Sequence, residues 1–282
     1  MYKIGIIGKG FVGSAVNFGF SSKEECEIKI YDKDPKKSQN SLSSVVNDSD
    51  FIFISVPTPS NTDGSINLKV VDRCLNEINK IIESDAILLL RSTMTPGSSN
   101  MFQQKYPKLN IVFNPEFLTE RNADFDFINQ SRFILGGNIN HVKQVSKLYR
   151  WRFGSLSPII ETTFETAELI KYMNNCFLAT KVSFLNEMKL IADECGADWK
   201  KSVEGFSLDK RIGNSHTAVP GPDGKLGFGG SCLPKDIQAM ISYADKLDIK
   251  LNTLIGVWST NLEVRPDKDW EQLIGRSVID KD

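Results

Sequence analysis

A glycine cluster between two strand-like segments dominates the start of this chain. Residues 2–7 form a short apolar run typical of a buried strand, and Gly8, Gly10 and Gly13 follow at once. An apolar stretch compatible with a helix comes next, and a second strand-like run ends at Asp32, nineteen residues after Gly13. Strand, glycines, helix, strand and acid in this order predict a dinucleotide-binding unit.

Each glycine has a separate physical role in such a unit. Gly8 permits the tight turn, Gly10 lets a pyrophosphate approach the backbone, and Gly13 lets the helix pack closely on the strand. The amino end of the helix then faces the phosphates with its positive pole. Asp32 can accept hydrogen bonds from a ribose and would repel a 2′-phosphate, which favours NAD over NADP. The neighbouring Lys33, Lys36 and Lys37 keep NADP open, although a solvated basic loop is the simpler interpretation of at least two of them.

Strand and helix signals continue to alternate through the first half of the chain. Strands are predicted at 50–56, 86–91, 111–113 and 133–135, with a helix at 68–83. This alternation predicts an α/β fold with a doubly wound, Rossmann-type parallel sheet. Ligands bind beyond the carboxyl ends of such strands, so the polar segments there are candidates for function. For their threonines and acids, turn chemistry or simple exposure remains an alternative; the segments are Pro57-Thr58-Pro59, Ser92-Thr93 and residues 114–120.

The second half reads as an all-α domain that begins with one long helix. Thr162 and Glu165 form a plausible capping box, and Gly196 is a natural end. Lys171 and Asn175 are four residues apart and so share one face, where both can donate hydrogen bonds to a developing oxyanion. A lysine stem packed along apolar neighbours and an exposed asparagine is the simpler alternative.

A glycine-rich loop then leads to the most reactive candidate in the chain. The sequence Gly229-Gly230-Ser231-Cys232-Leu233-Pro234-Lys235-Asp236 places one thiol behind a glycine pair, with a cation and a carboxylate close behind it. A nearby lysine favours the thiolate, and Asp236 can act as a general base or orient a water. A small buried cysteine would be the usual interpretation of Cys232 alone, but its neighbours favour a nucleophile. We further expect two helices, at 237–247 and 251–262.

Composition narrows the possible functions. The chain has 282 residues and a net charge of −1, so no basic field points to nucleic acid. No apolar run approaches the length of a membrane span. Five cysteines without a CxxC pair argue against a disulfide framework and fit a reducing cytoplasm, and only two histidines make a zinc site improbable. We expect an NAD-binding domain at 1–161, a helical central domain at 162–262 and a C-terminal tail at 263–282.

Taken in order, these motifs resemble the nucleotide-sugar 6-dehydrogenases of the UDP-glucose/GDP-mannose dehydrogenase family, from about residue 1 to 262. The motifs that carry the resemblance are Gly8–Gly13, Val56–Pro59, Ser92-Thr93, Asn114–Glu120, Ala167–Asn175, Arg211–Gly213 and Gly227–Asp236. The resemblance implies two NAD-dependent hydride transfers that convert the C6 alcohol of UDP-glucose to a carboxylate. Cys232 would carry the thiohemiacetal and the thioester. The oxidation of UDP-N-acetylmannosamine or GDP-mannose remains an alternative, as does an NAD-binding protein that is inactive without a partner.

The resemblance also assigns roles to residues. Arg211 would reach across the interface of a homodimer formed through the long helix. The family carries a third domain that grips the UDP, and we expect this chain to be a shortened form without it. The implied catalytic residues are Cys232, Lys171, Asn175, Asp236, Thr93 and Glu120. The implied cofactor contacts are Gly8, Gly10, Phe11, Val12, Gly13, Asp32, Lys37, Pro57, Thr58, Thr93, Glu120 and Lys235. The implied substrate contacts are Glu116, Phe117, Leu118, Lys171, Asn175, Arg211, Phe228 and Gly229.

Overall fold

The computed structural model describes residues 1–279, which divide into two compact units. The first unit comprises 1–58 and 68–171, and the second comprises 59–67 together with 172–279. The boundary falls within one continuous helix, between Lys171 and Tyr172. Each unit is described by itself below.

A seven-stranded sheet forms the centre of the first unit. Its order is β2-β1-β3-β4-β5-β6-β7. The bounds are β1 Tyr2–Ile7, β2 Cys26–Tyr31, β3 Phe51–Ile54, β4 Ile87–Leu90, β5 Asn110–Phe113, β6 Phe133–Gly137 and β7 Ile159–Thr162. Strands β2 and β3 lie on opposite sides of β1, so the strand order reverses direction beside β1. The carboxyl end of β1 is therefore the switch point where an open α/β sheet binds its ligand.

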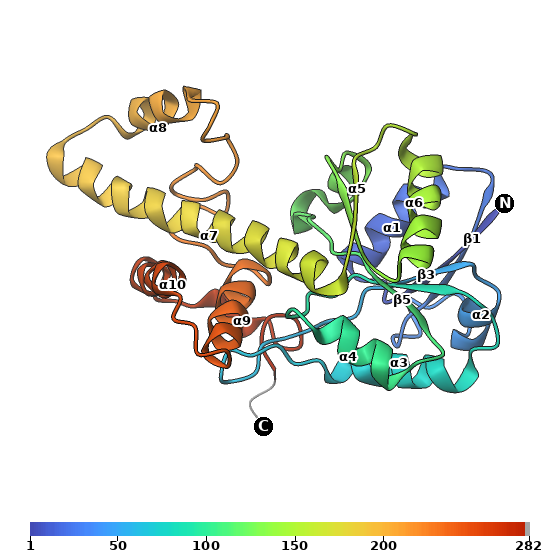
Figure 1. The fold of residues 1–282 in the computed structure, drawn as a ribbon. Helices are drawn as coiled ribbons and strands as arrows, with labels where there is room; N and C mark the ends of the chain where they lie inside the picture. The colour runs from blue at the N-terminus through green and yellow to red at the C-terminus, as the bar shows by residue number, and fades with distance from the viewer. Residues whose placement is uncertain (280–282) are drawn as a thin grey trace. The chain divides into compact units, whose positions relative to one another are not determined.

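Helices cover both faces of this sheet, as Figure 1 shows. One face packs against α1 (Phe11–Ser21), α5 (Ala123–Ile128) and α6 (Ile139–Phe153), around a core that includes Phe20, Phe53 and Tyr149. The other face packs against α2 (Leu42–Asn47), α3 (Lys69–Ile81) and α4 (Ser98–Lys105). The short strands are apolar on both faces because both faces are buried. The prediction of a doubly wound sheet is confirmed.

The sheet departs from the prediction in one pairing. All neighbouring strands run parallel except β5 and β6, which are antiparallel. Between them the chain forms η1 (Glu120–Asn122) and α5, and α5 packs against α1. The sheet is therefore mostly parallel, with a single antiparallel pair between β5 and β6. A short apolar strand carries no signal of its direction, because both faces are buried in either orientation.

The second unit is built from helices. It contains most of α7 (Phe164–Cys195), then α8 (Trp199–Leu208), α9 (Leu233–Asp245), α10 (Asn252–Val264) and the short η2 (Asp269–Gln272). Its core includes Tyr172, Ile237 and Val257. The long helix and the two later helices are thus confirmed, with shifted ends.

One local prediction is corrected in this half of the chain. The side chain that caps α7 is Thr163, whose hydroxyl accepts from the Thr166 N–H at 3.3 Å, because Thr162 is still the last residue of β7. The segment after α10 is packed in the part that the structure describes. Trp270 is buried against Trp258, and Ser60 forms backbone hydrogen bonds with Ser277 and Ile279. The last three residues of the predicted tail, 280–282, lie outside the described residues.

Candidate active site

The glycine cluster has the geometry that a dinucleotide requires. Gly8 has φ +92°, and a Cβ there would lie 2.5 Å from the Ser55 carbonyl oxygen. A Cβ on Gly13 would lie 2.0 Å from the Gly8 carbonyl oxygen. Around Gly10, the N-cap of α1, nothing lies within 4 Å of such a Cβ. The backbone at Gly10 therefore has free space in front of the amino end of α1, whereas Gly8 and Gly13 are packed against other backbone atoms. Free space at this end of the helix fits a phosphate group.

Asp32 follows β2 and is fixed by backbone donors. Its Oδ2 accepts from the Lys9 N–H at 2.6 Å, and its Oδ1 accepts from the Asp34 N–H at 2.9 Å. The carboxylate thus lies directly beside the glycine turn, as a ribose-binding acid should. Lys33, Lys36 and Lys37 are exposed, as the interpretation of a solvated loop predicts. Phe11 and Val12, in the first turn of α1, are half-buried.

The ends of β3 and β4 carry the next predicted residues. Pro57 is exposed and Thr58 is buried just after β3. Thr93 is buried just after β4. The Ser92 hydroxyl donates to the Val56 carbonyl at 2.6 Å, so the two strand ends are bonded to each other. The polar segments at this edge of the sheet therefore lie together, as the topology predicts.

A buried ion pair connects the segment after β5 to α7. The Lys171 ammonium donates to Glu116 Oε1 at 2.8 Å and to the Glu116 carbonyl at 2.6 Å. Glu116 Oε2 accepts from the Leu118 N–H at 2.7 Å. Both side chains of the pair are almost fully buried, so the alternative of a surface acid at Glu116 is wrong. A charge buried without a partner is costly, and here each charge satisfies the other.

The neighbours of Glu116 differ in exposure. Two cations lie over the Phe117 ring, with Lys171 Nζ at 5.4 Å and Arg132 Cζ at 4.5 Å from its centroid. Leu118 is buried in the core of the first unit. Glu120 is exposed and begins η1. The exposed carboxylate of Glu120 is accessible to water, and the buried carboxylate of Glu116 is paired with Lys171.

Sequence reasoning missed Glu168, one turn before Lys171. Its side chain is fully buried, and its two oxygens accept from the Gly97 and Ser99 N–H groups, each at 2.7 Å. Burial raises the pKa of Glu168 to about 7, against the lowering effect of these hydrogen bonds. The carboxylate caps α4 and holds the segment that leads from β4. Positions 168, 171 and 175 share one helical face, and that spacing was the available signal.

In the second unit, α9 places the cysteine motif. Cys232 is the N-cap of α9, and Pro234 stands in the first turn, where a proline loses no hydrogen bond. The Asp236 carboxylate is buried one turn further on. Its Oδ2 accepts from Asn175 Nδ2 at 2.6 Å and its Oδ1 accepts from Lys235 Nζ at 2.8 Å. Asn175 is therefore buried and bonded, so the alternative of an exposed asparagine is wrong, and so is that of a lysine head in solvent at Lys171.

The remaining predicted residues of this unit lie on loops. Phe228 packs in the core of the second unit, and its N–H and carbonyl are both bonded to Asn261. The side chain of Arg211 is 88% exposed and is paired with Asp209. Lys181 is buried and donates to the carbonyls of the residues after Arg211, Ile212 at 3.1 Å and Gly213 at 2.6 Å. Arg211 is therefore an exposed side chain on a turn whose backbone is held by Lys181.

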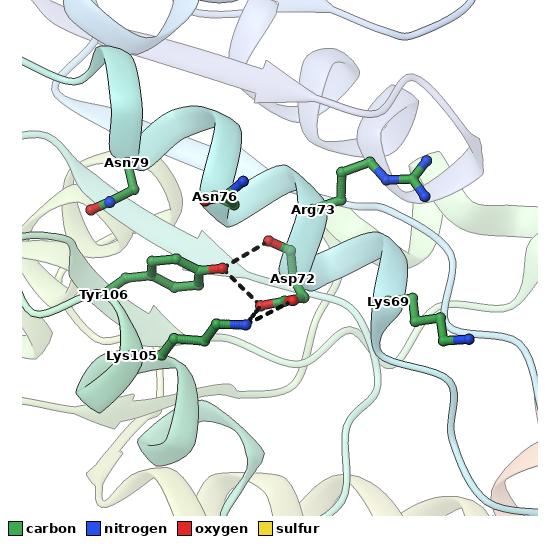
Figure 2. Close-up of a pocket in the computed structure, with 7 residues that line it drawn as sticks. All are labelled: Lys69, Asp72, Arg73, Asn76, Asn79, Lys105 and Tyr106. Atoms are coloured by element: carbon green, nitrogen blue, oxygen red, sulfur yellow. Dashed lines mark hydrogen bonds and ion pairs between the residues drawn. The ribbon is translucent and has the colours of Figure 1, made fainter.

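A separate hollow of about 570 Å³ lies between α3 and α4 (Figure 2). Within it, Asp72 accepts hydrogen bonds from Lys105 and from the Tyr106 hydroxyl. None of the predicted catalytic, cofactor or substrate residues lines this hollow. Its lining consists of Lys69, Asp72, Arg73, Asn76, Asn79, Lys105 and Tyr106.

Two further features are absent from residues 1–279. No helix there is both long enough and apolar enough to cross a membrane. No group of three or more histidine, cysteine or acidic side chains in that part of the chain could hold a metal ion.

Comparison with known proteins identifies the family. Residues 36–152 match the NAD binding domain of the UDP-glucose/GDP-mannose dehydrogenase family, and residues 165–263 match its central domain. The chain belongs to this family. Its first unit therefore contains the family's NAD-binding domain.

Individual relatives agree with this assignment. The UDP-glucose 6-dehydrogenase of Rickettsia bellii is 38% identical over 217 residues, which are 75% of this chain and 49% of the relative. UDP-glucose 6-dehydrogenase TuaD of Bacillus subtilis is 33% identical over 233 residues, 80% of this chain and 49% of the relative. A solved UDP-glucose dehydrogenase from Pyrobaculum islandicum superposes with a TM-score of 0.83 at 27% identity, covering 93% of this chain and 68% of that one. The chain spans about half the length of the curated relatives it matches.

Proposed function

We propose that this chain oxidises the C6 alcohol of UDP-glucose to a carboxylate, with NAD as the oxidant. One alcohol, two NAD⁺ and one water give one carboxylate, two NADH and three protons. The observation that carries the proposal is the arrangement around Cys232. A thiol stands at the amino end of α9, one turn before a buried carboxylate that is bonded to Asn175 and Lys235. That combination suits a covalent route through a thioester.

NAD would supply the hydride acceptor, and the open backbone at Gly10 with the fixed Asp32 carboxylate would hold it. We assign Phe11, Val12, Lys37, Pro57 and Thr58 to the same site. Thr93, Glu120 and Lys235 would also contact the cofactor.

The protein's own groups would divide the remaining work. Cys232 Sγ would add to the aldehyde carbon formed in the first oxidation, and the second oxidation would leave a thioester. Lys171 and Asn175, one turn apart on α7, would donate hydrogen bonds to the oxyanion in both steps. Asp236 would accept the proton of the attacking water, and the thiol would leave as the carboxylate forms. Thr93 and Glu120 would orient the water, while Glu116 would act by holding the Lys171 ammonium in place.

The substrate side of the proposal rests on loops. We assign the sugar to Glu116, Phe117, Leu118 and Gly229, as the resemblance implies, and to the exposed Arg211 of a partner subunit. Phe228 would act as a core anchor of its loop, since its ring and backbone are engaged within the unit. We further propose that the two units act as cofactor domain and substrate domain, and that the protein works as a cytoplasmic homodimer. Five free cysteines support a reducing compartment.

The test is NADH formation by the purified protein with NAD and UDP-glucose. We expect two NADH per UDP-glucose. Cys232→Ser should lower the rate by about a thousandfold or more, because the nucleophile is lost. The matched control is Cys195→Ser, which replaces an exposed cysteine at the end of α7 and should leave the rate unchanged. If NADH formed with another nucleotide sugar but not with UDP-glucose, the proposed substrate would be wrong. If no nucleotide sugar gave NADH, the proposal would be refuted.

A further inference from the structure

Three buried side chains hold the backbone that leads to Cys232. The Gly227 N–H donates to Asn186 Oδ1 at 3.0 Å, and Asn186 lies on α7. Asn261 and Arg265, at the end of α10 and just beyond it, contact the same stretch of loop. All of these residues belong to the second unit. None of them was a candidate from the sequence, where an isolated asparagine or arginine carries no signal.

Asn261 binds this backbone at two points. Its Oδ1 accepts from the Phe228 N–H at 2.7 Å, and its Nδ2 donates to the Phe228 carbonyl at 3.0 Å. The side chain is fully buried. A Cβ on Gly227 would lie 2.5 Å from Asn261 Oδ1, so only glycine allows the amide to approach this closely. The side-chain amide of Asn261 thus bonds both backbone groups of Phe228, as a neighbouring β-strand would, and fixes the direction of the loop.

Arg265 contacts the same loop on both sides of Phe228, at Leu226 and at Gly229. Its Nη1 donates to the Leu226 carbonyl at 3.2 Å, and a Cβ on Gly229 would lie 2.4 Å from its Nη2. The guanidinium is buried, and two carboxylates compensate its charge. Asp269 accepts from Nε at 3.0 Å and from Nη2 at 2.6 Å, and Asp223 accepts from Nη2 at 2.7 Å. A guanidinium that is hydrogen-bonded to two carboxylates is held rigidly. The loop backbone that packs against it is therefore held in place as well.

We propose that Asn261 and Arg265 are positioning residues that hold residues 226–229 and thereby place the Cys232 thiol at the amino end of α9. This inference deepens the proposed function and rests on it for the chemistry of Cys232. Thiolates are favoured at the amino end of a helix, and a displaced reacting group reacts more slowly. Loosening the loop therefore lowers the reactivity of Cys232 without touching the nucleophile itself.

The test follows the alkylation of each cysteine by iodoacetamide at neutral pH, using mass spectrometry of tryptic peptides. Cys232, Cys195 and Cys176 lie on three different peptides, 226–235, 190–200 and 172–181. Cys195 is exposed and reports the reagent, while Cys176 is buried and reports unfolding. We expect Asn261→Ala and Arg265→Met to slow alkylation of Cys232 by about fivefold, with Cys195 unchanged and Cys176 still protected.

Two further variants separate positioning from a general loss of stability. Arg265→Lys keeps the charge and should restore part of the rate. Asp267→Ala breaks only the exposed ion pair with Lys225 and should behave as wild type. If Asn261→Ala fails to fold, Arg265→Lys still tests the inference. Positioning by the guanidinium predicts that Cys232 in this variant is alkylated at a rate between those of wild type and Arg265→Met. Unchanged or faster alkylation of Cys232 in folded variants would overturn the inference.

Activity gives a second readout. Because the loop positions a reacting group, kcat should fall by about tenfold to a hundredfold while the KM for NAD stays within about twofold. The alkylation experiment needs neither NAD nor a nucleotide sugar. A protein that forms no NADH but shows the alkylation pattern would refute the proposed function alone, and two NADH per sugar without the pattern would refute the positioning role alone.

Discussion

At the residue scale, the buried charged side chains described at the candidate site each have a partner. Lys171 pairs with Glu116 and Lys235 pairs with Asp236, while Glu168 accepts from two backbone N–H groups. Glu168 is the sharpest case, because burial raises its pKa to about 7 although two backbone N–H groups favour its charged form. The other causes are the Ser99 side chain, which lowers the pKa, and the Glu165 carboxylate, which raises it. The helix cap on α4 is thus made by a group that titrates near neutral pH.

This raised pKa predicts how stability depends on pH. The folded protein binds the Glu168 proton up to about pH 7, whereas the unfolded chain releases it near the ordinary value of 4.5. The contribution of Glu168 to the free energy of unfolding is therefore largest at low pH and falls as the pH rises from 4.5 to 7. We expect wild type to lose about 2–3 kcal/mol relative to Glu168→Gln between these limits. Urea unfolding at several pH values measures this difference in the free energy of unfolding. If the free energies of the two proteins changed with pH in parallel, the assigned pKa would be contradicted.

At the scale of single elements, the junction of β1 and α1 separates a folding role from a binding role within one motif. Gly13 is needed for packing, because a Cβ would collide with the Gly8 carbonyl. Gly10 is not needed for packing, because the space around it is open and its φ of −82° suits any residue. The same sequence motif therefore holds glycines for two different physical reasons.

The matched pair Gly10→Ala and Gly13→Ala tests this separation. Gly13→Ala should lower the free energy of unfolding by about 3 kcal/mol, because backbone atoms must move to make room. Gly10→Ala should cost about 1 kcal/mol or less but weaken NAD binding by at least about tenfold, because its methyl group occupies the place of a phosphate. Thermal unfolding and NAD titration by calorimetry supply both numbers. Equal stability losses in the two variants would contradict the separation.

At the scale of the whole molecule, α7 carries an apolar stripe that its own unit leaves exposed. Met173, Phe177, Phe184 and Ile191 are spaced by four, seven and seven residues, so they follow one side of the helix. All four side chains are exposed, and Phe177 is 66% exposed. Several exposed apolar side chains along one side of a helix are typical of an interface, which supports the proposed homodimer.

Sedimentation velocity decides whether this stripe joins two copies. We expect wild type to sediment as a dimer and Phe177→Glu as a monomer, because a charge in an apolar interface remains unpaired. Leu156→Glu is the control, since Leu156 is exposed on the other unit and lies outside the stripe. If wild type sedimented as a monomer at every concentration measured, the proposed homodimer would be refuted.

Local patterns were enough to predict the fold class and to name the candidate site residues of this protein. The glycine spacing with Asp32 identified the switch point of the sheet, and helical spacing put Lys171 and Asn175 on one face. The motif around Cys232 pointed to a nucleophile before any contact was known. Each of these signals lies within a few residues along the chain, where spacing and steric limits act directly.

Only the tertiary structure decided which side chains support those candidates. The pairing of Lys171 with Glu116 joins residues 55 apart, and that of Asn175 with Asp236 joins residues 61 apart. The direction of β6 and the contacts of Asn261 and Arg265 with the cysteine loop also depend on packing. Burial makes a partner obligatory for such a group, but it does not specify where along the chain that partner lies. The sequence by itself therefore determined which residues are candidates for the chemistry, and the fold determined what holds those residues in place.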